Sequence, residues 1–391
     1  MKKLALGVIT NNIYSTSPYI NFIKNALKYG HKINTLIIAY SDKYKKKVIE
    51  KLNKHVQLKL IKLPDDYKFK LTLKNLGLTE SKIKTLFQFP LYEKYNMIPY
   101  GIRRNCVLMQ ALMMKPRADY LFFIDTDVYP EVVLNCEGDR REVDFFGSHL
   151  QYLAQDDVII TTSDYSGYYI IPPMSFPEIK NLLAGLQKEQ AYHRIKNFKQ
   201  NLTIVSQAGI NVRKTDKVLG GNHAVNLKYG YKLAPYFSTY YRFNKELIMG
   251  RGEDTVLGKG LAKKGLKIID IDTKIYHNTY GNFPEKPLIK DPQVQERLYY
   301  ACLGWIGRNP FLNWFCNKKA SKDRLKALEK ASKDLAEYLN NKKFLHLTDA
   351  YRASQKQLEE MKEFYERTIS AWNSFKKQLY GGWHNLEDSV G

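Results

Sequence analysis

Two aspartates, Asp125 and Asp127, directly follow the apolar run 120–124. The run predicts a buried strand, and side chains two positions apart on an extended backbone share one face. Carboxylates at the carboxyl end of a parallel strand suit a hard divalent cation, which then bridges the protein and substrate phosphates. Turn-capping carboxylates produce the same pattern, as Asp270 and Asp272 illustrate, so the pair alone does not decide its role.

Three more candidates lie much further along the chain. Glu253 and Asp254 follow Gly250-Arg251-Gly252 and open a predicted helix, where backbone N–H groups and the helix dipole stabilise a carboxylate. Ordinary N-terminal capping explains these two residues equally well. His277 follows the next predicted strand, and imidazole suits Mn²⁺ beside oxygen ligands, although a lone histidine is more often structural.

The elements that must position these residues are short apolar strands alternating with helices. We expect strands at 4–9, 33–40, 56–63, 120–124, 158–162, 168–171, 219–225 and 266–271. We expect helices at 19–29, 43–54, 102–114 and 252–264, and irregular structure over 64–100, where Pro64, Pro90 and Pro99 interrupt the pattern. Strand, helix and parallel strand in succession predict the α/β class, with ligands gathered at the carboxyl ends of the strands.

After Pro292 the apolar residues recur with helical spacing only. Apolar residues recur with helical period over 325–339 and 358–379, and Gly381-Gly382 ends the second helix. We therefore expect an α/β domain over residues 1–290 and an all-helical C-terminal appendage over residues 291–391.

Charge and cysteine content narrow the class of protein. The chain carries 62 Lys and Arg against 39 Asp and Glu, a net charge of +23, which indicates an anionic partner or merely lysine-rich usage. The basic stretch 43–54 is explained as a solvated helix face, and no nucleic-acid signature is present, which argues against nucleic-acid binding. Four cysteines without CxxC spacing argue against a zinc or disulfide scaffold. No apolar run approaches bilayer length, so we expect a cytoplasmic protein.

The order of these elements resembles that of GT-A nucleotide-sugar glycosyltransferases over roughly residues 4–285. The matching segments are Gly7-Val-Ile-Thr10, Gly101-Ile-Arg-Arg104-Asn105, Phe123-Ile-Asp125-Thr-Asp127, Gly220-Gly221-Asn222, Gly252-Glu253-Asp254, Gly265-Leu-Lys-Ile and His277. The later segments are similar to the Gly-Gly, Trp-Gly-Gly-Glu-Asp and His series of beta-4 galactosyltransferases. Arg104-Asn105 resembles the Arg-Asn pair of large bacterial inverting families. Gly250-Arg251-Gly252 departs from Trp-Gly-Gly, so the tryptophan wall of the acceptor site is missing here.

The resemblance implies a Rossmann-like, mainly parallel GT-A sheet and a donor site at its edge. Asp127 and His277 would ligate Mn²⁺ or Mg²⁺, with Asp125 at the metal or at the nucleotide ribose. The implied contacts to the nucleotide-diphosphate sugar are Thr10, Asp42 and Arg104.

The resemblance also assigns the acceptor side. Gly220 and Gly221 would let the backbone approach the sugar or acceptor closely, which glycine permits without steric cost. Asp254 would be the general base and Glu253 its neighbour. A nucleoside diphosphate leaves with its charge neutralised by the metal, so one carboxylate that deprotonates the acceptor hydroxyl suffices for inversion. A retaining outcome stays open, because sequence does not show the attacked face.

One other class of enzyme and one class of binding protein remain alternatives. A nucleotidyltransferase would use Asp125 and Asp127 for metal–phosphate chemistry but leave Asp254 without a task. A basic nucleic-acid-binding protein would explain the charge and none of the carboxylates. We expect glycosyl transfer of hexosyltransferase type, with a glycan, a glycolipid or a small molecule as the acceptor.

The role of the C-terminal helices has two interpretations. Their apolar stripes predict packing on the catalytic domain or on a second copy of the chain. The aromatic segment 305–315 beside Lys318-Lys319 suits a peripheral contact at the inner face of the membrane. From Lys318 onward the chain has 15 basic and 11 acidic residues, so this part is not the basic one, and we favour packing.

Overall fold

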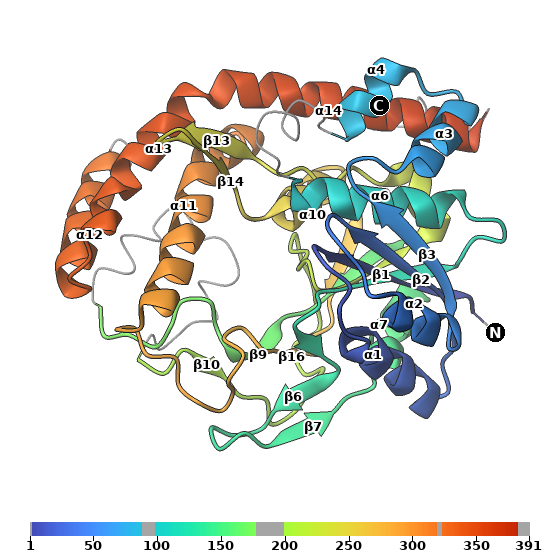
Figure 1. Cartoon of the computed structure of the whole chain (residues 1–391), viewed down its shortest axis with the longest axis horizontal. Helices are drawn as coiled ribbons and strands as arrows, with labels where there is room; N and C mark the ends of the chain where they lie inside the picture. The colour runs from blue at the N-terminus through green and yellow to red at the C-terminus, as the bar shows by residue number, and fades with distance from the viewer. Residues whose placement is uncertain (1, 88–97, 177–198, 319–322, 382–391) are drawn as a thin grey trace.

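An eight-stranded, mainly parallel sheet forms the core of the N-terminal part, on the right of Figure 1. The computed structural model describes residues 2–87, 98–176, 199–318 and 323–381. The strand order is β11-β15-β8-β12-β4-β1-β2-β3, in which β12 and β11 run against their neighbours. The strands are β1 (Leu4–Thr10), β2 (Ile33–Tyr40), β3 (Gln57–Lys62), β4 (Tyr120–Ile124), β8 (Val158–Thr162), β11 (Arg213–Lys214), β12 (Asn222–Asn226) and β15 (Lys267–Asp270).

Helices cover both faces of this sheet. The helices of this part are α1 (Ser17–Lys28), α2 (Lys46–Asn53), α3 (Tyr67–Asn75), α4 (Glu80–Leu86), α6 (Tyr100–Met113), α7 (Phe145–Leu153) and α10 (Glu253–Lys263). One apolar core joins α3, α4, α6 and α10 to the sheet, and a second joins α1, α2 and α7 to its other face. The alternation of Phe122 and Phe123 between the two cores follows from the period of two along a strand. The predicted α/β class is confirmed.

The remaining strands form smaller sheets beside the eight-stranded sheet. Their strands are β5 (Val128–Tyr129), β6 (Glu131–Val133), β7 (Arg140–Glu142), β9 (Tyr165–Tyr168), β10 (Leu202–Thr203), β13 (Tyr240–Phe243), β14 (Glu246–Met249) and β16 (Ile275–His277). The order β10-β9-β16-β5 makes a four-stranded sheet, while β13 pairs with β14 and β6 with β7. A 3-10 helix (Leu227–Lys232) follows β12.

The predicted elements match the structure closely where apolar runs are compact. Strands 120–124 and 158–162 coincide with β4 and β8. The expected strand 168–171 is wrong, because the strand in this region is β9, which spans Tyr165–Tyr168. The polar residues of β9 lack the apolar pattern from which a strand is predicted. The expected irregularity of 64–100 is wrong in its first part, since α3 and α4 form there, each capped by a side chain, Asp66 and Thr79. Pro90 lies outside the described residues.

The C-terminal part is helical, as predicted. Its elements are α11 (Pro292–Phe315), α12 (Arg324–Tyr338), a 3-10 helix (Lys342–His346), α13 (Leu347–Lys356) and α14 (Leu358–Tyr380). In Figure 1, α14 runs from α13 back to α4. Trp372 of α14 is fully buried in the core of α6, and its Nε1 donates to the carbonyl of Leu233 at 2.9 Å.

This packing on the sheet domain is the interpretation that we favoured. Self-association through the same helices stays a prediction, as does a domain boundary at residue 290. Among the described residues, no helix combines the length and the apolar character needed to cross a bilayer.

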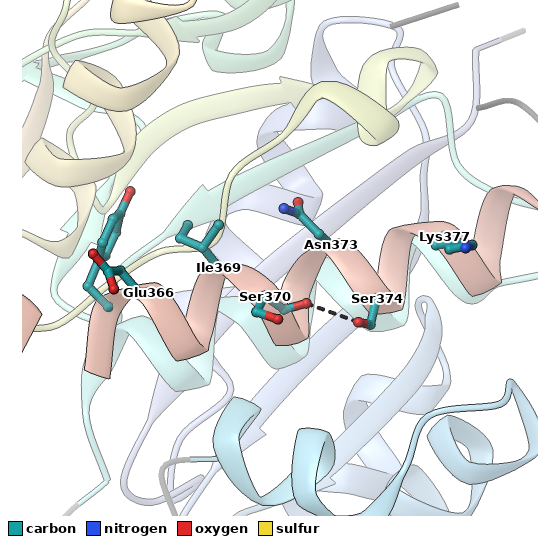
Figure 2. A pocket seen from close by; sticks show the side chains of 7 residues that line it. Glu366, Ile369, Ser370, Asn373, Ser374 and Lys377 are labelled. Carbon is teal, nitrogen blue, oxygen red and sulfur yellow. Dashed lines mark hydrogen bonds between the residues drawn. The ribbon is translucent and has the colours of Figure 1, made fainter. Parts of the chain in front are cut away.

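A pocket of about 600 Å³ lies along α14 (Figure 2). Its lining runs from Tyr365 to Lys377 and includes Ile369, with Ser374 donating to the carbonyl of Ser370 at 3.0 Å. None of the predicted site residues lines it, so we do not associate it with the predicted chemistry.

Glycines let α11 approach the β13–β14 hairpin closely. A Cβ atom on Gly307 would lie 2.0 Å from the Tyr241 ring, which is fully buried and whose hydroxyl donates to the carbonyl of Leu303 at 2.9 Å. A Cβ on Gly304 would lie 3.0 Å from Cγ of Arg251. The position of α11 therefore depends on small residues along one stripe.

We predict that Gly307→Ala destabilises the fold. Overpacking against Tyr241 should cost about 1–3 kcal/mol, offset by about 1 kcal/mol of helix propensity. Gly260→Ala in α10 is the matched control, because a Cβ there would lie an ordinary 3.4 Å from the Phe315 ring and the substitution should be neutral or stabilising. Chemical denaturation of both variants measures the difference; equal stability would show that α11 can move aside.

Candidate active site at the carboxyl edge of the sheet

Asp127 and His277 meet although 150 residues separate them in the chain. His277 Nε2 lies 3.1 Å from Asp127 Oδ2. The antiparallel pairing of β16 with β5 places His277 opposite Val128, and the Asn278 amide donates to the Asp127 carbonyl at 2.9 Å. Burial raises the pKa of Asp127. The hydrogen bond from His277 and the charge of His277 outweigh this effect and hold the pKa of Asp127 below its usual value.

A hydroxyl on the far side of the imidazole orients His277. Thr279 Oγ1 lies 3.2 Å from Nδ1 of His277 and donates to the Tyr168 carbonyl at 2.8 Å. With Nδ1 engaged in this way, Nε2 is the nitrogen that faces Asp127. A partner on one ring nitrogen that fixes the other for a ligand is the usual arrangement around metal-binding histidines.

Asp125 points to a different group of residues. Its Oδ1 accepts from Arg104 at 3.1 Å, and its Oδ2 accepts from the Tyr165 hydroxyl at 3.3 Å. The Tyr165 ring also packs on His277, with centroids 4.5 Å apart. Asp125 and Asp127 therefore share the end of β4, but Asp125 is neutralised by an arginine while Asp127 faces a histidine.

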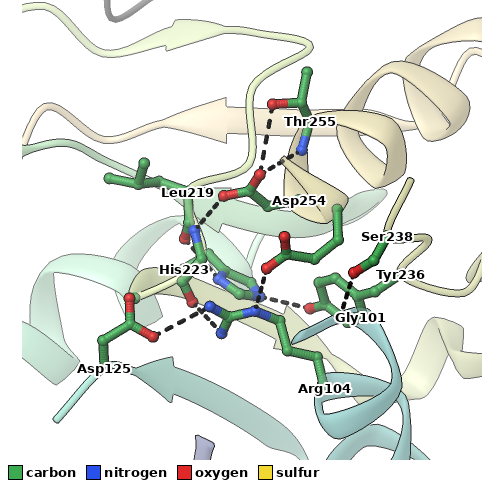
Figure 3. A network of polar contacts seen from close by, with 12 residues as sticks. Gly101, Arg104, Asp125, Leu219, His223, Tyr236, Ser238, Asp254 and Thr255 are labelled. Carbon is green, nitrogen blue, oxygen red and sulfur yellow. Dashed lines mark hydrogen bonds and ion pairs between the residues drawn. The ribbon is translucent and has the colours of Figure 1, made fainter. Parts of the chain in front are cut away.

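Arg104 of α6 joins three segments of the chain (Figure 3). Its Nε donates to Glu253 at 3.0 Å, its second nitrogen to the Gly220 carbonyl at 2.8 Å, and its third to Asp125. The side chain is 5% exposed and that of Glu253 is 7% exposed. Burial alone would lower the pKa of Arg104, but the charges of Asp125 and Glu253 raise it above its usual value.

Asp254 lies beside this ion pair at the first turn of α10. Its Oδ2 accepts from the Gly220 amide at 2.8 Å and its Oδ1 from the Thr255 amide at 2.7 Å (Figure 3). Burial and the neighbouring charge of Glu253 raise the pKa of Asp254 to about 6, against the opposing effect of Arg104. The result is a fixed carboxylate with an increased affinity for protons.

Gly220 and Gly221 are required by side chains of the protein itself. A Cβ on Gly220 would lie 2.4 Å from an Arg104 nitrogen, and one on Gly221 would lie 2.4 Å from Asp125 Oδ2. Close approach at these glycines was predicted for a sugar or acceptor; the structure shows the approach of Arg104 and Asp125.

Thr10 and Asp42 lie at the ends of β1 and β2, and the arginine beside them is Arg103. Arg103 donates to the Thr10 carbonyl at 2.8 Å and to the Asn11 side chain at 2.6 Å. Asn12 donates to Asp42 at 3.4 Å, which links the two loops. Arg104, which was predicted to contact the nucleotide, is the next residue of α6, and it contacts Glu253, the Gly220 carbonyl and Asp125.

Sequence reasoning missed two residues of the site. Tyr165 follows β8 at the same edge of the sheet, and its position after a parallel strand was the available signal. Arg308 of α11 is 2% exposed, and a Cβ on Gly252 would lie 1.4 Å from its Nη1. An arginine inside the apolar segment 303–315 was the signal for Arg308, because a charge in such a stretch needs a partner.

Within the described residues, no group of three or more His, Cys, Asp or Glu side chains is arranged to hold a metal ion. Asp127 and His277 form a pair that would need further ligands from substrate or water. Mg²⁺ commonly binds in this way, through one or two carboxylates and substrate phosphates.

Comparison with known proteins finds similarity in structure alone. No protein-family model matches the chain, and no curated protein matches it in sequence. Glucosyl-3-phosphoglycerate synthase from Mycobacterium tuberculosis, crystallised with Mn²⁺, UDP and phosphoglyceric acid, shares 13% identity and a TM-score of 0.41, covering 82% of this chain and 80% of that one. The same enzyme with Mg²⁺ and UDP shares 11% identity and a TM-score of 0.39, covering 82% and 81%. No residue role follows from a likeness at this level.

We predict that Arg104→Met destabilises the protein by about 3–5 kcal/mol, because it leaves the buried carboxylate of Glu253 without its counter-charge. Adding Glu253→Gln should recover part of the loss, and a double-mutant cycle on unfolding free energies measures the coupling. Arg242→Met is the control, since it breaks an exposed pair with Glu360 and should cost about 0–1 kcal/mol. Equal losses for Arg104→Met and Arg242→Met would contradict the prediction.

Proposed function

We propose that the chain is a metal-dependent glycosyltransferase of hexosyltransferase type, which moves a sugar from a nucleotide-diphosphate sugar to an acceptor hydroxyl. The observation that carries the proposal is that two separate groups of side chains lie at one edge of the sheet. Asp127 and His277 offer ligands to a metal, while Asp254 offers a carboxylate whose pKa is raised. The resemblance to GT-A enzymes, including the beta-4 galactosyltransferase-like series, assigns the same roles to these three residues.

The donor set at Asp127 and His277 fits Mn²⁺ or Mg²⁺. One carboxylate oxygen and one imidazole nitrogen converge, and Thr279 lies at the other ring nitrogen. The bound ion would neutralise the charge of the departing nucleoside diphosphate. The role that the resemblance gives Asp125, at the ribose or the metal, competes with its ion pair to Arg104.

Residues at the ends of β1 and β2 would hold the nucleotide. Thr10 and Asp42 keep their predicted roles, and we add Arg103, which lies between them and is 7% exposed. Its Nε is buried and has no hydrogen-bond partner among the described residues. Arg104 would act by positioning Glu253 and Asp125.

Asp254 would accept the proton of the attacking hydroxyl. The Gly220 amide and the amide and hydroxyl of Thr255 fix its carboxylate, and Oδ2, which accepts only from Gly220, retains a lone pair for a further hydrogen bond. Glu253, held by Arg104, contributes the charge that raises the pKa of Asp254. These features support an inverting mechanism. A nucleotidyltransferase would leave the carboxylate of Asp254 without a use.

We predict that the protein slowly hydrolyses its donor in the presence of Mn²⁺, and that Asp127→Ala abolishes this activity. A screen of common nucleotide-sugars identifies the donor, and calorimetry measures nucleoside diphosphate binding with and without metal. Asp127→Ala should lose the metal-dependent part of the affinity, whereas the control Asp156→Ala, at an exposed position, should keep it. Unchanged metal dependence in Asp127→Ala would remove the metal site from the proposal.

We predict that Asp254→Asn keeps donor affinity and lowers turnover about 10²–10⁴-fold, the usual contribution of a general base. Asp254 must be ionised to accept a proton, so the kcat of the unaltered protein should fall as the pH drops through about 6. Metal and donor are kept saturating at each pH, so that their binding does not limit the rate. Full activity in Asp254→Asn would move the role to Glu253 or favour retention.

A further inference from the structure

A buried histidine, His223, contacts the turn that holds the candidate base (Figure 3). The Gly220 amide donates to Oδ2 of Asp254 at 2.8 Å, so the direction of this amide fixes one carboxylate oxygen. Nδ1 of His223 lies 2.8 Å from the carbonyl oxygen of Leu219. The Leu219 carbonyl and the Gly220 amide belong to one planar peptide group, so a contact that orients the carbonyl also orients the amide.

The hydrogen bonds around His223 assign its protonation state. A carbonyl oxygen only accepts, so the ring proton that lies between His223 and the Leu219 carbonyl is on Nδ1. Burial, and after it the charge of Arg104, lowers the pKa of His223 well below its usual value, so the ring is neutral. Nε2 lies 2.6 Å from the Tyr236 hydroxyl and therefore accepts from it, which keeps Nδ1 as the donor.

Asn105 of α6 fixes the position of Tyr236. Its side-chain nitrogen donates to the Tyr236 carbonyl at 2.9 Å, and its Oδ1 accepts from the Tyr236 amide at 2.8 Å. Asn105, Tyr236 and His223 are each at most 1% exposed. Because Asn105 follows Arg104 in α6, the helix that binds Glu253 through Arg104 also reaches the turn, through this chain of hydrogen bonds.

The register of β12 places the His223 ring beside the turn. His223 lies opposite Phe123 in the antiparallel pair of β12 and β4, and cross-strand partners share one face of the sheet. The two rings stack with centroids 4.7 Å and planes 13° apart. An apolar side chain could fill this core position without burying polar atoms, so the contact with the Leu219 carbonyl is what a histidine adds.

We propose that His223 is a positioning residue, which orients the Leu219–Gly220 peptide group toward the candidate base Asp254. The proposal rests on the proposed function, because it states how the base of that same site is held. Tyr236 and Asn105 support His223 from the opposite side of its ring. Hydrogen bonds in a chain polarise one another, so the bond from Nδ1 also makes the Gly220 amide a better donor to the carboxylate.

The turn keeps some support without His223. The Leu219 carbonyl also accepts from the Asn222 amide at 3.1 Å, and the Leu219 amide donates to Oγ1 of Thr162 at 3.0 Å. Loss of the contact from His223 should therefore loosen the turn and leave the strand in place.

Two substitutions separate the Nδ1 donor from the rest of the ring. His223→Asn places an amide nitrogen near the position of Nδ1 and keeps a donor for the Leu219 carbonyl. His223→Gln reaches the position of Nε2 and leaves that carbonyl with the turn bond alone. Both lose the stacking on Phe123. Asn226→Ala is the control for stability, because Asn226 is 6% exposed at the other end of β12 and donates to the Leu153 carbonyl at 3.2 Å.

We expect His223→Gln to keep its donor affinity and to lower kcat about tenfold, the order of magnitude for one hydrogen bond to a charged group. A carboxylate that loses a donor binds protons more tightly, so the fall of kcat on acidification should move from about pH 6 upward by about one unit. His223→Asn should retain most of the turnover and the unaltered pH profile, and Asn226→Ala should change stability only. The variants leave in place the charged and titratable groups that act on Asp254, which are Glu253, Arg104, Arg308, Tyr165 and Tyr236.

Hydrogen exchange of the peptide that contains Gly220, read by mass spectrometry, tests the same link without activity. Exchange should be faster in His223→Gln than in the unaltered protein and close to normal in His223→Asn. Equal exchange in both variants and the unaltered protein, equal kcat and pH profile in the two variants, or an equal loss of turnover in Asn226→Ala would overturn the positioning role. The proposed function fails separately, if the unaltered protein shows neither donor hydrolysis nor metal-dependent nucleotide binding, and the exchange result then decides whether His223 holds the turn.

Discussion

The buried ion pair of Arg104 with Glu253 is the constraint on which the site depends. A guanidinium that is 5% exposed is tolerated only when its charge and its N–H groups are satisfied, and Glu253, Asp125 and the Gly220 carbonyl satisfy them from three separate segments. Removing Arg104 would leave the buried carboxylate of Glu253 without its counter-charge. The end of β4, the start of α10 and the turn before β12 are therefore fixed relative to α6.

Several features of the sequence follow from that constraint. Gly220 and Gly221 have no side chains because Arg104 and Asp125 fill the space. Gly252 has a φ of 100°, which disfavours other residues, and Arg308 occupies the volume that a Cβ would need. The glycines that resemble a family motif thus have local structural reasons. Burial and the charge of Glu253 in the same cluster raise the pKa of Asp254.

The sequence predicted the sheet better than the pairings at its edge. Compact apolar runs gave β4 and β8, because burial on both faces leaves a continuous signal. The contact of Asp127 with His277 depends on two short strands, β5 and β16, whose length carries little periodicity. The choice between Arg103 and Arg104 could not be made from residue type, since adjacent helix positions point in directions about 100° apart.

The helices after residue 291 contribute to the site, which their sequence pattern did not indicate. The spacing of apolar residues predicts which faces of the helices pack, but it does not predict the role of a charged residue that those faces enclose. Two arginines of α11 show this: Arg308 lies against the Gly252 turn, and the charge of Arg297 contributes to lowering the pKa of Asp127. Because α11 also depends on Gly304 and Gly307 for its position, a change in helix packing would alter the charges around Asp127 and Asp254. The stability of the C-terminal part and the electrostatics of the site are consequently coupled through one helix.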